Sequence, residues 1–423
     1  MSARTLAGGR VGGLPRPSRI LVAWLAFLAI VFVAGLAAWG YQMANGLRVT
    51  AMRNTVMWGQ YILFFMFFVG LSAGGLIVAS AGRLFGVARF RPIVRLAVLE
   101  ATVAVMLAAL FLWPDIGRPE RIWHLFVYPN PTSPMIWDIA IVTVYFVVST
   151  TYVFLYTRHD LAAAGSPLAL GTKATPAGLR RDDRLKGGLA WIALPAAILL
   201  HSITAWIFGL QISRGFWYTA IMAPLFISSA LVSGLALVIL LALAVRRTGR
   251  LTFGDDLVAW LGGMLCVFVA VEAFFVLSES LTAAYPGAAF EADPIGRLVA
   301  GPYAPLFAFE VVVGLGLPFV LLAVRPLRTR VPVVALASVV AIVGIFVHRL
   351  NIVLNGLSYP PIGLPPGVPI GIAPAAGSTA FAESYWYVPS LVEWLVVGGV
   401  LAFGGLVFTV ATLILPLREA DHG

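Results

Sequence analysis

The sequence predicts an all-α polytopic membrane protein with ten transmembrane helices. Of its 423 residues, 61% are hydrophobic and 11% are charged, whereas soluble domains carry about a quarter charged residues. Apolar runs of the roughly 20 residues that span a bilayer recur along the whole chain. These runs are too long and continuous for barrel strands, so we expect each to be a helix that satisfies its own backbone hydrogen bonds.

The distribution of positive charge supports the helix count and sets the orientation. With the N-terminus placed in the cytoplasm, 21 of the 28 Lys and Arg residues fall on the cytoplasmic side of the alternating helices. Such a bias predicts that both termini are cytoplasmic. It also accounts for the net charge of +10 without a nucleic-acid partner.

The first apolar run, 20–41, is too long for the core of a cleavable signal peptide, which predicts a signal anchor. The ten helices are expected at 20–41, 57–80, 94–113, 136–157, 188–210, 218–245, 256–280, 303–324, 331–350 and 388–416. They divide the chain into a cytoplasmic tail (1–19), a first helix with its outer loop (20–56), two four-helix bundles (57–210 and 218–350), an outer Pro/Gly-rich loop (351–387) and a last helix with a short cytoplasmic tail (388–423).

Small residues mark where helices are expected to approach closely. They occur from Gly70 to Gly75 in the second helix and at Ser228, Ser229, Ser233 and Gly234 in the sixth. Small side chains at helical spacing let two backbones pack closely in a membrane.

The outer loop at 113–136 differs from a plain connection. From Asp115 to Asp138 the sequence reads DIGRPERIWHLFVYPNPTSPMIWD, with two arginines, a histidine, two tryptophans, four prolines and three acids. Long irregular loops in compact proteins tend to be functional or disordered, and this composition is typical of a folded site rather than a tether. We therefore expect a folded site at the outer membrane surface. Arg118 and Arg121 also have a structural interpretation, in which they pair with Asp115 and Glu120.

Ionisable residues within the helices are candidates for function, because charge is costly in lipid. They are Glu100, Asp138, His201, Glu272, Glu279, Glu310, His348, Arg349 and Glu393. Most fall in the outer half, and Glu272 and Glu279 share a helix face. A proton path through Glu272, Glu279 and Glu100 is one interpretation; structural pairs such as Arg349 with Glu393 or Glu383 are the other.

Three segments resemble the NrfD/PsrC family of quinone-interacting membrane subunits. They are the Asp115–Asp138 loop, WGQYILFFMFFVGLSAGG (Trp58 to Gly75) and the stretch from His201 to Gly234. The C-terminal HRLN (His348 to Asn351) and YVPSLVEW (Tyr387 to Trp394) resemble the longer ten-helix members.

This resemblance implies a membrane anchor and quinone-reactive subunit of a respiratory oxidoreductase. The chain would lie in the bacterial inner (cytoplasmic) membrane with its active face periplasmic. It would bind menaquinone or ubiquinone and carry no haem, flavin or metal. The implied partners are a periplasmic four-cluster ferredoxin-like iron–sulfur subunit and a molybdopterin-type catalytic subunit.

For the quinone pocket the candidates are His124, Asp138 and His201, with Arg118 and Trp123 shaping it. A histidine can donate to or accept from a quinone oxygen, although a lone membrane histidine such as His201 is also a common packing group. Two other functions stay open. A haem-bearing cytochrome b-type anchor needs paired histidines, for which His201 and His348 are the candidates. A secondary transporter would favour broken helices in matched halves.

Overall fold

A computed structural model describes residues 18–418 except 54–55, 174, 286–288 and 359–386. The expected tails at 1–17 and 419–423, and most of the expected Pro/Gly-rich loop, lie outside the described residues. Within the described part the chain is helical and contains no strand. Ten of the described helices are long and apolar enough to cross a membrane, which confirms the predicted fold class.

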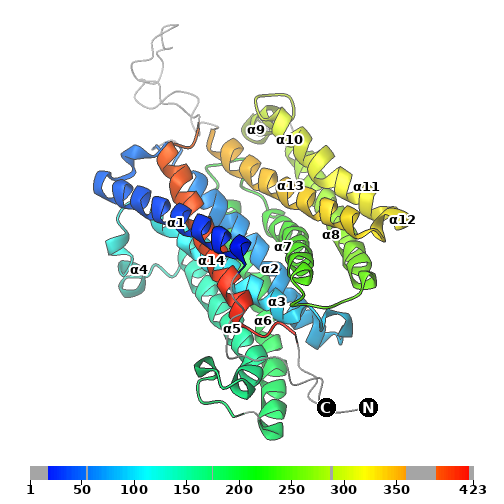
Figure 1. Cartoon of the computed structure of the whole chain (residues 1–423). Helices are drawn as coiled ribbons and strands as arrows, with labels where there is room; N and C mark the ends of the chain where they lie inside the picture. The colour runs from blue at the N-terminus through cyan, green and yellow to red at the C-terminus, as the bar shows by residue number, and fades with distance from the viewer. Residues whose placement is uncertain (1–17, 54–55, 174, 286–288, 359–386, 419–423) are drawn as a thin grey trace, which may run out of the picture.

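The ten candidate spans follow the predicted order (Figure 1). They are α1 (Arg19–Asn45), α2 (Gln60–Leu84), α3 (Val94–Asp115), α5 (Pro134–Ala163), α6 (Pro176–Gly209), α7 (Met222–Arg247), α8 (Asp255–Ala284), the combined α10–η5–α11 span (Ala304–Ala323), α13 (Val331–Ser358) and α14 (Leu391–Ile414). Short helices connect them: η1 (Leu47–Val49), η2 (Ala88–Phe90), η3 (Pro119–Arg121), α4 (His124–Val127), η4 (Pro167–Ala169), α9 (Ala289–Val299) and α12 (Arg325–Arg328).

Local sequence explains where several spans begin. The Ser18 side chain accepts a hydrogen bond from the Leu21 amide at the start of α1. Thr175 caps α6 in the same way, with Pro176 in the first turn. Ser390 and Glu393 form a reciprocal capping box at α14. Each cap satisfies amide groups that the first turn of a helix leaves without partners.

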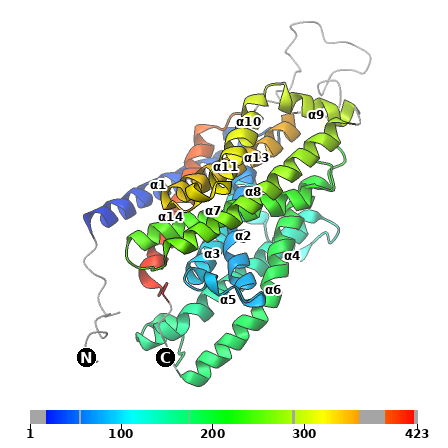
Figure 2. The same cartoon turned by 90° about the vertical axis from the view of Figure 1, so that its right-hand side faces the viewer.

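Helix α2 is the centre of the molecule, and nearly all of its side chains are buried. It packs against α3, α6 and α7, while α5 packs against α3 and α6. On the other side, α7 packs against α8 and α13, and α13 packs against η5 and α11 (Figure 2). Because α2 and α7 are in direct contact, the two sets of helices share one core. The division into two separate four-helix bundles stays a prediction.

Helices α2 and α7 approach closely at Gly74 and Gly234. A Cβ atom added to either glycine would overlap backbone atoms of the other. Only residues without side chains fit at such a crossing. The prediction that the small residues of these helices mark close packing is confirmed.

Helices α1 and α14 form an antiparallel pair on the outside of α3. The Trp24 indole donates to Thr409 Oγ1 at 3.2 Å, and the rings of Phe32 and Phe403 lie 5.2 Å apart. The start of α1 therefore lies beside the end of α14. The cytoplasmic placement of both termini stays a prediction.

Candidate functional site

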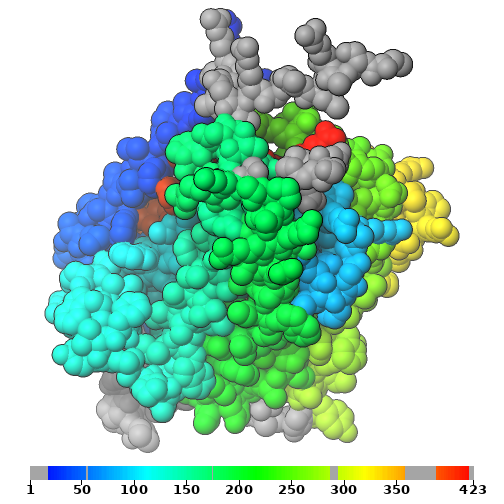
Figure 3. Space-filling view, turned by 90° about the horizontal axis from the view of Figure 1, so that it is seen from below, coloured from blue at the N-terminus to red at the C-terminus, as the bar shows by residue number. Residues whose placement is uncertain are grey.

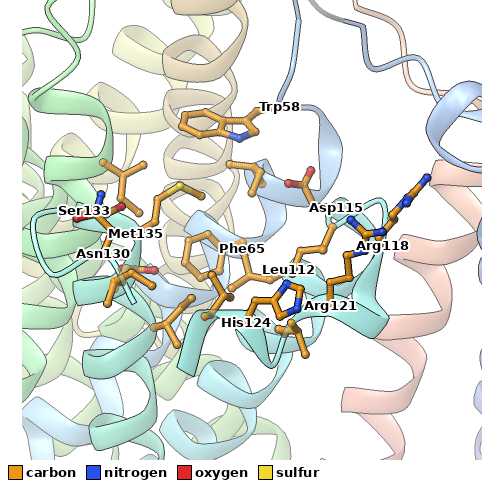
Figure 4. Close-up of a pocket in the computed structure, with 18 of the residues that line it drawn as sticks. Trp58, Phe65, Leu112, Asp115, Arg118, Arg121, His124, Asn130, Ser133 and Met135 are labelled. Carbon is orange, nitrogen blue, oxygen red and sulfur yellow. The ribbon is translucent and has the colours of Figure 1, made fainter. Parts of the chain in front are cut away.

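A cavity of about 430 Å³ lies where α3 ends and α5 begins. Its wall combines residues of α2, α3, α5 and α6 with the loop between α3 and α5. In Figure 4, Asp115 and His124 lie on one side of the cavity, with Asn130, Ser133 and Met135 on the other. In the space-filling view of Figure 3, the segment around this loop (cyan) forms a bulge at the edge of the molecule. The family-like loop thus folds over a cavity.

Aromatic and aliphatic side chains form most of the wall. Trp58 stacks on Trp217 with ring centroids 5.7 Å apart, and the edge of Phe208 meets Trp58 at 5.3 Å. Phe65 and Ile62 of α2 also line the cavity. Packed rings of this kind present a rigid apolar surface that suits a flat ligand.

Asp138 is the most deeply buried acid of the wall, with a relative exposure of 3%. Its Oδ1 atom lies 2.6 Å from the hydroxyl of Thr204 on α6. This hydrogen bond joins the start of α5 to α6 and fixes the carboxyl orientation. An acid at the edge of a ligand cavity can accept or donate a proton there.

Asp115 is a second acid in the cavity wall. Its Oδ1 atom is buried and has no hydrogen-bonding partner among the described residues. The preceding residue is anchored from two helices: Gln42 of α1 donates to the Pro114 carbonyl at 2.7 Å, and Tyr61 of α2 donates to the side-chain carbonyl of Gln42 at 2.6 Å. The backbone that carries Asp115 is therefore held in place while its carboxyl faces the cavity.

The basic side chains of the wall come from the loop. Arg118, Arg121 and His124 all line the cavity. The ring of His124 meets Trp123 edge-on at 3.9 Å between centroids. In the described part of the chain, neither arginine lies within 4 Å of a carboxylate oxygen of Asp115 or Glu120. The structural interpretation in which those pairs fold the loop is therefore not supported.

Two of the five predicted pocket residues lie outside the cavity lining. The ring of Trp123 contacts that of His124 edge-on, and Trp123 is half exposed. His201 is buried between α6 and α2, with Nδ1 2.6 Å from the Ala197 carbonyl and Nε2 3.2 Å from the Val69 carbonyl. Both of its ring nitrogens therefore face backbone oxygens.

The predicted proton-path residues fall in two places. Glu272 and Glu279 lie on α8 in a polar cluster with Glu310 and His348, in which Glu279 is partly buried and the other three are buried. Glu100 lies on α3 in the other set of helices, where it is fully buried. The structure thus brings together two of the three acids.

The suggested pair of Arg349 with Glu393 is wrong, and Glu383, the other suggested partner, lies outside the described residues. Glu393 instead accepts hydrogen bonds from the amides of Ala51 and Ser390, both at 2.8 Å, and from the Tyr387 hydroxyl. Burial and the nearby Glu393 charge raise the pKa of Tyr387, and its hydroxyl, protonated at neutral pH even without this shift, donates to Glu393. These contacts attach α14 to the segments before α2.

Sequence reasoning did not select several residues that line the cavity: Trp58, Phe65, Asp115, Tyr128, Asn130 and Ser133. The signal for most of them was present, because all but Trp58 and Phe65 belong to the Asp115–Asp138 motif or its flank. Trp58 and Phe65 belong to the Trp58–Gly75 segment, the second of the segments that resemble the NrfD/PsrC family. Their contribution depends on which face α2 turns toward the loop.

Comparison with known proteins identifies the family. The sequence profile of the polysulphide reductase NrfD family matches residues 48–361. The chain belongs to the NrfD family. Over 402 residues it is 39% identical to a Halobacterium salinarum protein named as a candidate membrane subunit of dimethyl sulfoxide reductase, covering 94% of this chain and 92% of that protein.

More distant relatives extend this picture. The chain is 25% identical to a selenate reductase subunit of Mesobacillus selenatarsenatis, with 93% of each chain covered. It is 24% identical to an Hdr-like menaquinol oxidoreductase integral membrane subunit of Archaeoglobus fulgidus, covering 92% of this chain and 93% of that protein. This NrfD-family chain is therefore a multi-pass integral membrane subunit of an oxidoreductase.

Proposed function

We propose that this chain exchanges electrons and protons between the membrane quinone pool and an iron–sulfur partner subunit. The observation that carries the proposal is the cavity in which Asp115, Arg118, His124 and Asp138 meet an aromatic wall. A bound quinone supplies a flat redox group that carries two electrons and two protons.

Each polar residue of the cavity has a role in this proposal. His124 and Arg118 donate hydrogen bonds to quinone oxygens, while the carboxyl groups of Asp138 and Asp115 accept protons from quinol hydroxyls. Thr204 orients Asp138, and Trp123 supports the His124 ring. His201 does not touch the ligand in this account; it braces α6 against α2. Groups held in place by such contacts need little reorganisation during the reaction.

The proposed partners follow from where electrons must leave. An iron–sulfur subunit of the ferredoxin-like type would dock over the loop between α3 and α5, close to the cavity. A molybdopterin-type subunit would carry the terminal reaction. The names of the relatives as reductase membrane subunits support this assignment. The excess of Lys and Arg on one side of the helices supports an orientation with the cavity at the opposite face, which is periplasmic in the proposed cytoplasmic membrane location.

A menaquinone-type ligand is favoured by the relative named as a menaquinol oxidoreductase subunit. For proton movement, we propose a role for Glu272 and Glu279, which share the α8 cluster. Glu100 remains a candidate for a separate proton contact within the first set of helices.

The two competing functions fit the geometry less well. Haem ligation by His201 would require breaking its contact to a backbone carbonyl, since both ring nitrogens already face one. A transporter with matched halves would show interruptions in the fourth and eighth spans alike. The eighth span contains the π-helix η5 (Phe309–Gly316), whereas the fourth, α5, is continuous.

Purification of the native complex in mild detergent tests the proposed function. We expect an iron–sulfur subunit to co-purify, quinone to be extracted in amounts close to one per chain, and no haem band in reduced-minus-oxidised spectra. A chain that purifies alone without quinone would contradict the proposal. A haem spectrum that is lost on His201→Ala substitution would favour the cytochrome alternative.

A further inference from the structure

A second group of ionisable side chains lies apart from the cavity, among α7, α8, η5 and α13. Its members are Glu272, Glu279, Glu310, His348, Arg349 and Asn351. Glu272, Glu310 and Arg349 have relative exposures of 0%, 1% and 1%. Neither the proposed quinone contacts nor the packing of the helices requires three acids at this place.

Both carboxyl oxygens of Glu310 have hydrogen-bonding partners within the cluster, whereas Glu272 and Glu279 each have an oxygen without one in the described part of the chain. Both oxygens of Glu310 are engaged: His348 Nδ1 lies 2.8 Å from one, and Asn351 donates to the other at 2.7 Å. Glu272 accepts from Ser228 through one oxygen. Its second oxygen and Glu279 Oε1 are buried without a partner among the described residues.

Arg349 supplies the fixed positive charge of the cluster. Its guanidinium donates to Ser229 Oγ at 2.5 Å and lies 3.6 Å above the centre of the Phe226 ring. It makes no ion pair within 4 Å with any described carboxylate. Its charge nonetheless interacts with those of Glu272, Glu279 and Glu310.

Charge balance determines how many protons the cluster holds. Isolated charges are very costly in a low-dielectric interior, so buried charges must be paired or neutralised. When His348 is protonated, it balances the Glu310 carboxylate, to which its Nδ1 atom is hydrogen-bonded. Arg349 balances one of the two remaining carboxylates. One carboxyl of the Glu272–Glu279 pair is then left without a positive partner. It avoids an unpaired buried charge by carrying a proton.

The space between these groups suits proton exchange. A cavity of about 10 Å³ lies among Glu279, Glu310, His348 and Asn351, which is close to the volume that one water molecule needs. His348 Nε2 lies 3.9 Å from Glu272 Oε1, too far for a direct hydrogen bond but suitable for a bridge through one water.

A metal ion fits this place poorly. The guanidinium of Arg349 would repel a cation, and the described residues contain no group of three or more acid, histidine or cysteine side chains arranged to hold one. We propose that the Glu272–Glu279 pair holds a single exchangeable proton, balanced by Arg349 and by the Glu310–His348 ion pair.

An aromatic contact connects this cluster to the large cavity, and one of its acids lies in an irregular helix. Phe226, under Arg349, lies 6.1 Å from Phe208 between ring centroids, and Phe208 lines the large cavity. Glu310 lies in the π-helix η5, a rare form that often marks functional sites.

Infrared difference spectroscopy on the purified, quinone-free complex tests the proposal directly. Spectra recorded in H₂O and D₂O at neutral pH would show a carboxylic acid carbonyl band that shifts on deuteration. We expect Glu272→Gln and Glu279→Gln each to abolish this same band, because Arg349 then balances the one carboxylate that remains. The Arg349→Gln variant is expected to double the band, since both acids then need a proton.

Control variants show whether loss of the band comes from the missing carboxyl or from misfolding, and they do not depend on the proposed quinone site. Glu100→Gln removes another buried acid and should leave the band in place. Glu279→Asp keeps a carboxyl and should shift the band rather than abolish it. A band that survives both glutamine variants, or that disappears on addition of sodium chloride but not choline chloride, would overturn the proposal. The inference rests on the proton-moving role proposed for Glu272 and Glu279. Because no quinone is present in this test, its failure would remove that role and leave the proposed quinone exchange at the cavity untouched.

Discussion

At the residue scale, Asp138 and Thr204 form the contact most directly tied to proton exchange in the cavity. Asp138→Asn keeps the size of the side chain and its contact with Thr204 but removes the proton acceptor. We expect quinol-dependent electron transfer by the complex to fall about 100-fold, a typical contribution of one acid–base group. Turnover with a soluble quinol analogue would measure this effect.

Thr204→Val serves as the matched control for Asp138→Asn. It leaves the carboxyl in place and removes the hydrogen bond that orients it, together with the contact of the same hydroxyl to the Leu200 carbonyl within α6. A loss of about 10-fold is expected, which corresponds to roughly 1.4 kcal/mol. Equal losses in the two variants would mean that Asp138 acts through structure rather than through its proton.

Asp115 carries a separate prediction, because its buried oxygen faces the cavity without a protein partner among the described residues. Asp115→Asn should lower turnover and leave assembly of the complex unchanged, since no described hydrogen bond to its side chain is lost. Gln42→Leu, which breaks the contact to the Pro114 carbonyl, should instead lower the thermal stability of the chain. Turnover and melting temperature, measured on both variants, would separate the two effects.

The residues of the site were only partly predictable. Arg118, His124 and Asp138 line the cavity, and their place within one motif made them good candidates. His201 was equally plausible by residue type, yet α6 turns it toward the Val69 carbonyl while Ile207 and Phe208 face the cavity. The rotation of a helix whose faces are all apolar cannot be set from hydropathy alone.

At the element scale, the crossing of α2 and α7 depends on the absence of side chains. Gly74→Val would force Cβ and methyl groups into the backbone of Gly234. Overpacking of this kind costs about 1–3 kcal/mol, which should appear as a lower unfolding midpoint in detergent. Gly40→Val is the control, because no atom lies within 4 Å of the added Cβ there. Equal midpoints for the two variants would show that the close crossing is not needed.

The sequence predicted the ten membrane-spanning helices but did not predict the irregular turn within one of them. Uninterrupted apolar runs were enough to predict all ten spans, because lipid allows few alternatives to a helix. The π-helix η5 (FEVVVGLG) has the same apolar composition as an ordinary span. Within it, Gly314 packs closely against Gly344 of α13, a tertiary contact that local sequence does not specify.

At the scale of the whole molecule, the orientation in the membrane is open to a direct test. Tyr128, in the loop over the cavity, and Leu185, near the start of α6, have relative exposures of 74% and 45%. In a Cys266→Ser background produced without the proposed partner subunits, which would cover this loop, we expect Tyr128→Cys to react with an impermeant maleimide added to intact spheroplasts. Leu185→Cys should react only after permeabilisation. The reverse pattern would invert the predicted topology.

The central claim is that quinone binds in the cavity beneath the α3–α5 loop, and a photoreactive quinone tests it most directly. The native complex would be labelled with an azidoquinone, digested and mapped by mass spectrometry. We predict that the label falls within residues 112–139 or 58–65, and that excess natural quinone prevents it. Label confined to α8–α13, or to the apolar groove among α1, α3 and α14, would contradict the account.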